Sequence, residues 1–165
     1  MAVYGVIRTD RLHGSDNGAD LVSVRYSPAG TDTIIENGNV VLLGALDTSN
    51  REVFVGATPA ADSAIGKIAI VAEPEVLADE RLKLLSDFRN EAGAVVRAYR
   101  LVTGDVFSVS PAAVTAIVGT APAIGQLVEL AADTKLKLVA TPTSQSTQVG
   151  TVIEATTAFI TILVA

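Results

Sequence analysis

Hydrophobic and polar residues alternate in short runs along most of the chain, which is the pattern of half-buried β-strands. Residues 21–26, Leu-Val-Ser-Val-Arg-Tyr, show it most clearly. Residues 40–46 are a longer apolar run, and residues 51–55 alternate again after the turn-forming sequence Asp-Thr-Ser-Asn. An Asn37–Gly38 pair precedes these two segments and is typical of a tight turn. The pattern therefore predicts a β-hairpin over residues 40–55.

Shorter apolar segments recur along the rest of the chain, separated by Gly, Pro, Thr and Asp residues. The strands that they predict are residues 3–7, 65–72, 94–101, 106–110, 126–130, 135–140, 149–155 and 158–164. Short strands at regular spacing are typical of closed or layered β folds. We therefore expect a mainly β protein, built as a small barrel or sandwich of short antiparallel strands.

Residues 75–90 are the one helical candidate. Their leucines lie roughly at helical spacings, and acidic residues stand near the start, where the helix dipole favours negative charge. Gly93 follows as a stop signal. The pattern predicts one short helix, and a single helical turn fits it as well.

Residues 1–33 are rich in Gly, Asp, Ser and Asn and contain only two short alternating pieces. We expect them to form an extended N-terminal arm that folds back or reaches a neighbour, and residues 34–165 to form a single β-rich domain. A basic stretch followed by a long apolar run does not occur at the start, so a signal peptide is not expected. The longest apolar stretch is far shorter than a membrane-spanning helix needs, so we expect no membrane partner.

Composition adds an expectation about assembly. Hydrophobic residues make up 49% of the 165 residues, whereas charged residues make up only 18%, against about 25% in typical domains. A surface with few charges is suited to being covered by other subunits. The net charge of −6, with the central basic residues interleaved with acidic ones, argues against nucleic-acid binding.

Side chains that carry chemistry are scarce. The chain has no cysteine and a single histidine, His13, in a loop-like stretch, so no thiolate or histidine-based metal site is expected. A Ser-His-Asp triad would have to use this one histidine, and its loop is a poor place for a tightly held base. Acidic neighbours such as Asp16 and Asp20 are best interpreted as surface charges. We therefore expect no catalytic residues, cofactor or metal.

Two stretches resemble the head decoration proteins of tailed bacteriophages. The first is Leu-Asp-Thr-Ser-Asn-Arg-Glu-Val at residues 46–53, followed by the strand at residues 64–72. The second is Tyr-Arg-Leu-Val-Thr-Gly-Asp-Val-Phe at residues 99–107, and the apolar strand at residues 160–164 is also similar. The chain departs from that family by extra residues between 111 and 151.

The resemblance implies a non-enzymatic structural protein that binds the outside of an assembled capsid and clamps neighbouring major capsid subunits. It implies a homotrimer on the virion exterior, made in the cytoplasm of a bacterial host, with the N-terminal arm touching the shell. The arm residues expected to make that contact are Val3, Tyr4, Val6, Ile7, Arg8, Leu21, Val22 and Tyr26.

Two other interpretations stay open. The chain also suits a phage tail or fibre component, or another surface-layer packing protein, because Thr- and Ala-rich strands occur in either. A hydrolase with an unrecognised site is the third, and its best candidate residues are His13, Asp16 and Asp20.

Overall fold

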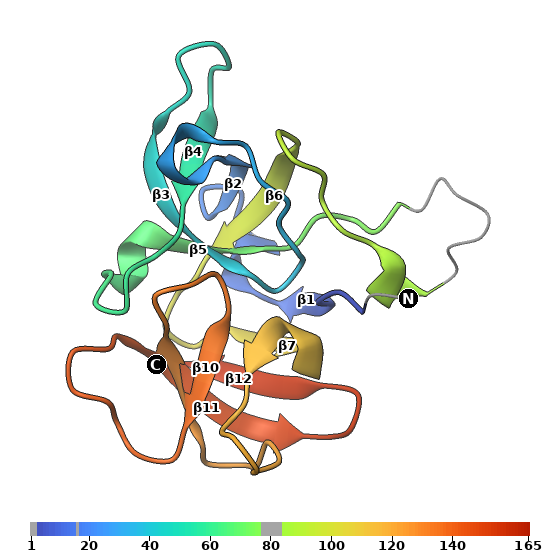
Figure 1. Ribbon diagram of the computed structural model, residues 1–165, viewed down its shortest axis with the longest axis vertical. Coiled ribbons are helices and arrows are strands. Elements are labelled where there is room, and N and C mark those ends of the chain that lie inside the picture. The colour runs from blue at the N-terminus through green and yellow to red at the C-terminus, as the bar shows by residue number, and fades with distance from the viewer. Residues whose placement is uncertain (1–2, 16, 77–83) are drawn as a thin grey trace.

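The computed structural model describes residues 3–15, 17–76 and 84–165 (Figure 1). Within these residues the chain forms short strands joined by turns and single 3-10 turns. The strands are β1 (Ile7–Arg11), β2 (Leu21–Tyr26), β3 (Val40–Leu46), β4 (Val53–Ala57), β5 (Ile68–Val71), β6 (Val95–Arg100), β7 (Val106–Val109), β8 (Val114–Thr115), β9 (Leu127–Leu130), β10 (Leu136–Val139), β11 (Gln148–Ala155) and β12 (Ile160–Val164). The 3-10 turns are η1 (His13–Ser15), η2 (Pro28–Gly30), η3 (Ile65–Lys67), η4 (Leu85–Asp87) and η5 (Pro111–Ala113).

The strands build two sheets that stack against each other (Figure 1). Five strands close into a barrel in the order β2-β4-β3-β5-β6, and seven form a second sheet in the order β1-β7-β12-β11-β9-β10-β8. The predicted mainly β fold is therefore confirmed. Most neighbours are antiparallel as expected, but β2 lies parallel to β4 and β10 lies parallel to β8.

Strand β5 is buried on both faces, which explains its unbroken apolar run. In β5, Ala69 and Val71 point into the barrel, whereas Ile68 and Ile70 point outward into the core shared with the second sheet. The barrel interior is tightly filled. A Cβ on Gly56 would lie 2.7 Å from a methyl group of Val24, so only glycine fits there.

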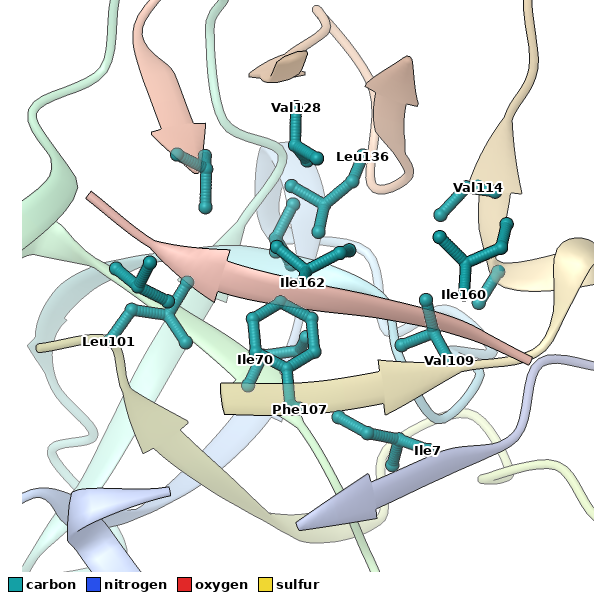
Figure 2. Close-up of a cluster of buried hydrophobic side chains, with 14 of the residues drawn as sticks. Ile7, Ile70, Leu101, Phe107, Val109, Val114, Val128, Leu136, Ile160 and Ile162 are labelled. Carbon is teal, nitrogen blue, oxygen red and sulfur yellow. The ribbon is translucent and has the colours of Figure 1, made fainter. Parts of the chain in front are cut away.

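The main hydrophobic core lies between the barrel and the seven-stranded sheet. Phe107 on β7 is its largest fully buried side chain. Figure 2 shows the Phe107 ring beside Ile70 of the barrel and Ile162 of β12, so both sheets contribute to one core. Backbone hydrogen bonds also join the halves, since Val40 N donates to Thr134 O at 2.7 Å.

The first 33 residues do not form a separate arm, which corrects the expected boundary. β1 pairs with β7 as the edge strand of the large sheet, and β2 lies between β4 and β6 in the barrel. The barrel cannot close without β2. The first strand was expected at residues 3–7 but runs from Ile7 to Arg11. Pairing with β7 places its polar and charged residues on an edge strand, where they remain in contact with solvent.

The helix expected over residues 75–90 is described only in part. Residues 77–83 lie outside the described residues, and the following segment contains the single 3-10 turn η4.

The predicted hairpin of β3 and β4 is confirmed, but β4 begins at Val53 instead of Arg51. Glu52 has a φ of 68° and so belongs to the turn.

Candidate interaction surfaces

The eight residues of the expected arm divide between core and surface. Val6 and Ile7 are buried, with Ile7 on the core side of β1, and Val22 and Tyr26 are buried in the barrel. Leu21 is half-buried against the main core. The residues that reach the surface are Val3, Tyr4 and Arg8, with Tyr4 half-buried. The eight residues therefore cannot all reach a partner at the surface, and only Val3, Tyr4 and Arg8 remain available for the expected capsid contact.

The N-terminal segment is fastened to the segment that follows residue 83. Tyr4 N donates a hydrogen bond to Ser86 O at 2.9 Å. A guanidinium nitrogen of Arg89 donates to the Tyr4 hydroxyl at 3.1 Å, and the guanidinium lies 5.7 Å from the centre of the Tyr4 ring. Hydrogen bonds to Glu91 and then to Tyr4 raise the pKa of Arg89. Figure 1 shows the described start of the chain, just before β1, running toward the yellow-green turn η4.

These two segments present a group of large apolar side chains to solvent. Val3, Leu84 and Leu85 are 68%, 63% and 54% exposed. We call these three residues the N-terminal apolar patch. Sequence analysis placed Leu84 and Leu85 in the helix expected over residues 75–90 and did not identify them as part of a surface. Large apolar side chains left exposed on neighbouring segments are suited to binding another protein.

The face of the large sheet that points away from the core is a second candidate surface, which we call the outer sheet face. It is formed by Val106, Ser108, Thr151, Ile153, Glu154, Thr161 and Leu163. Val106 pairs with Leu163, and Leu163 pairs with Thr151, whose other partner is Leu127. This row is mostly apolar although it faces outward, where antiparallel sheets usually carry polar side chains.

A polar row runs beside the apolar one. Arg8 is the register partner of Ser108. The Ser108 hydroxyl lies 2.9 Å from the Thr161 hydroxyl, which donates to the Glu154 carboxylate at 3.0 Å. Because an ionised carboxylate only accepts, Ser108 must be the donor to Thr161. A hollow of about 370 Å³ lies over this row, with Arg8 and Glu154 among its lining residues.

The Ser108 hydroxyl of the polar row does not donate to a base. Activation of a serine requires a base that accepts its proton directly. The Ser108 hydroxyl donates to the Thr161 hydroxyl, and the Glu154 carboxylate accepts a hydrogen bond from Thr161 instead. The polar row is therefore organised as a hydrogen-bonded surface.

The hydrolase candidates lie elsewhere. His13 Nδ1 is 2.7 Å from Asp20 Oδ2 on an exposed loop, and Asp16 lies outside the described residues. Among the residues that the structure describes, no group of three or more His, Asp or Glu side chains is placed to hold a metal ion. The single histidine thus pairs with one carboxylate.

The tip of the β3–β4 hairpin carries the turn residues of the resemblance. Asp47 Oδ1 accepts hydrogen bonds from the Ser49 backbone N at 2.9 Å and from its hydroxyl at 2.8 Å, and Oδ2 accepts from Arg25 Nε at 3.1 Å. The bonds from Ser49 and then from Arg25 hold the pKa of Asp47 well below its usual range. In turn, the hydrogen bond to Asp47 raises the pKa of Arg25. These residues stabilise the turn.

No family model matches this chain, and no curated protein matches it. In the described part of the chain, none of the helical segments has the length and hydrophobicity to span a membrane. Any functional conclusion therefore depends on the surfaces described above and on the resemblance at residues 46–53 and 99–107.

Proposed function

We propose that this chain is a structural protein of a tailed-phage virion. It is made in the cytoplasm of the bacterial host, binds the outer surface of the capsid and stabilises contacts between neighbouring major capsid subunits, without catalysing a reaction. The observation that carries the proposal is the N-terminal apolar patch, where three large side chains, each more than half exposed, lie on two segments joined by a hydrogen bond.

Charge supports a protein partner in preference to DNA. The chain has 12 Lys and Arg against 18 Asp and Glu. A net negative protein is repelled by a phosphate backbone, whereas a cap on the outside of a shell has no need to touch the genome. The apolar patch instead gains free energy by leaving water against another apolar surface.

The energetics favour attachment through several copies. Fully burying a Val or Leu side chain is worth about 1.5–3 kcal/mol, so three half-exposed side chains yield about 3–5 kcal/mol per chain. Association costs on the order of 4–15 kcal/mol, so one patch alone binds weakly. Three linked patches share that cost through their effective concentration. This is why we propose a homotrimer in which copies meet through the outer sheet face.

Sedimentation with phage heads tests the proposal. Heads from the encoding phage with this gene deleted would be mixed with purified chain and pelleted. We expect the wild-type chain to pellet with the heads and the Leu84→Lys/Leu85→Lys variant to stay largely in the supernatant. Val118→Lys is the matched control, because Val118 is 98% exposed on the loop between β8 and β9, outside the N-terminal apolar patch.

Three results would contradict the proposal. They are a wild-type chain that ignores heads, a chain that binds isolated tails instead, and equal loss of binding in the patch and control variants. Trimer formation is tested separately by light scattering after size exclusion. We expect Ile153→Lys, on the outer sheet face, to give a smaller species than Val118→Lys gives.

A further inference from the structure

The chain contains two Asn-Gly dipeptides, at residues 17–18 and 37–38, and the structure places them in opposite environments. We propose that Asn17–Gly18 is a self-modification site, at which the Asn17 side chain closes to a succinimide and opens to aspartate and isoaspartate. Asn37–Gly38 is protected by the fold. This inference is independent of what the chain binds.

The reaction needs only the chain and water. The backbone nitrogen of Gly18 attacks Cγ of Asn17, forming a new N–Cγ bond. The bond from Cγ to the amide nitrogen then breaks, and that nitrogen leaves as ammonia with the proton released from the Gly18 nitrogen. Water adds to either carbonyl of the ring, giving aspartate or isoaspartate. No oxidation or reduction takes place.

Asn37 cannot follow this path in the folded protein. Its side chain is fully buried, and its Nδ2 donates to Glu73 O at 2.8 Å and to Glu75 Oε1 at 3.1 Å. Its Oδ1 accepts from Glu73 N at 3.0 Å. The attacking nitrogen is also engaged, because Gly38 N donates to Val71 O at 2.8 Å. Attack would break several buried hydrogen bonds, each costly to leave unmade.

Asn17 lies in the opposite situation, on the exposed loop between η1 and β2. Among the described residues, nothing lies within 4 Å of the position that a Gly18 Cβ would take. The glycine nitrogen therefore approaches Cγ without steric hindrance from a side chain or a packed neighbour. Solvent can reach the ring that forms.

Two neighbours position the Asn17 amide for attack. Ala19 N donates to Oδ1 at 3.2 Å, and the same donor stabilises the negative charge that develops on Oδ1 when Cγ becomes tetrahedral. Nδ2 donates to Asp20 Oδ2 at 3.2 Å, and Asp20 is itself held by His13 Nδ1 at 2.7 Å. Ala19 and Asp20 are positioning residues, since neither forms a bond to the reacting atoms.

The product changes the local charge. A carboxylate at position 17 cannot donate to Asp20, and it places a second negative charge beside that residue. Isoaspartate also adds one backbone atom shortly before β2 begins at Leu21. We expect a more acidic species that separates on anion exchange and grows with the age of the preparation.

Peptide mass spectrometry after incubation at mildly alkaline pH tests the inference, with isoaspartate methyltransferase as an independent label. In the native protein we expect the amide-to-acid mass change and the label at position 17 and not at position 37. In urea both sites should react. Gly18→Ala is the matched variant, because a Cβ fits there without contact. It should fold normally and slow the modification about tenfold, which corresponds to about 1.4 kcal/mol in the barrier.

Three results would contradict the proposed modification of Asn17. Native modification of Asn37 at the rate of Asn17 would show that the fold does not discriminate. Suppression of both sites by the same factor on folding would show that Asn17 is neither accessible nor positioned. An unchanged rate in Gly18→Ala would show that the open approach at position 18 does not determine the reactivity of Asn17.

Discussion

A substitution at Leu12 tests whether the N-terminal residues form a detachable arm or an integral part of the fold. It follows β1 in a stretch that sequence analysis interpreted as loop, yet it is only 1% exposed and belongs to the main core. Truncation of a buried leucine to alanine costs about 2–5 kcal/mol through lost burial and the cavity left behind. We therefore expect Leu12→Ala to lower the free energy of unfolding by that amount. Val3→Ala, in the same segment but exposed, should change it by about 0.5 kcal/mol or less.

Urea unfolding followed by circular dichroism provides the measurement. With a slope of about 2 kcal/mol per molar urea, the expected loss lowers the midpoint by about 1–2.5 M. The slope should stay unchanged, because the same surface is exposed on unfolding. Midpoints for Leu12→Ala and Val3→Ala that both coincide with the wild-type value would refute the reasoning. They would support the interpretation of a detachable N-terminal arm.

Three further predictions concern stability. Because the pKa of Asp47 is lowered by folding, its contribution is complete above the unfolded pKa of about 3.9 and is lost as pH falls below it. Asp47→Asn should therefore flatten the decline in unfolding free energy as pH falls below about 4, and an identical decline in both proteins would contradict this. A Cβ on Gly150 would collide with the Leu163 carbonyl, so Gly150→Ala should cost about 1–3 kcal/mol. Gly66→Ala, with open space around it, should be nearly neutral in the same urea titration. Glu129 is almost fully buried, and its Oε2 has no hydrogen-bond partner among the described residues. Glu129→Gln should keep or raise the melting temperature in a calorimetric scan, because it removes a buried charge, and a clear fall would show that the charge is compensated.

Most strands were predictable from alternation and turn residues, because those signals are local. β2 and β3 have the predicted bounds, and the Asn37–Gly38 turn lies where expected, with Gly38 at a φ of 82°. The parallel pairing of β2 with β4 was not predictable, since it depends on contacts between residues about 30 positions apart. The low hydrophobicity of residues 1–33 also led to the wrong prediction of a separate arm, because β1 is an edge strand that buries few side chains.

The candidate surfaces were harder to predict than the fold. Leucines at helical spacing usually mark a buried face, yet Leu84 and Leu85 are exposed beside a single 3-10 turn. The outer sheet face depends on cross-strand register, which no local pattern encodes. Tyr4 is half-buried, and its contact with Arg89 brings together residues 85 positions apart.

Electron cryomicroscopy of phage heads, with and without this chain, tests the central claim most directly. We expect added density on the outer surface of the shell, lying over contacts between major capsid subunits, with the N-terminal apolar patch against the shell. Heads that look identical in both preparations, or density confined to tails, would contradict the account.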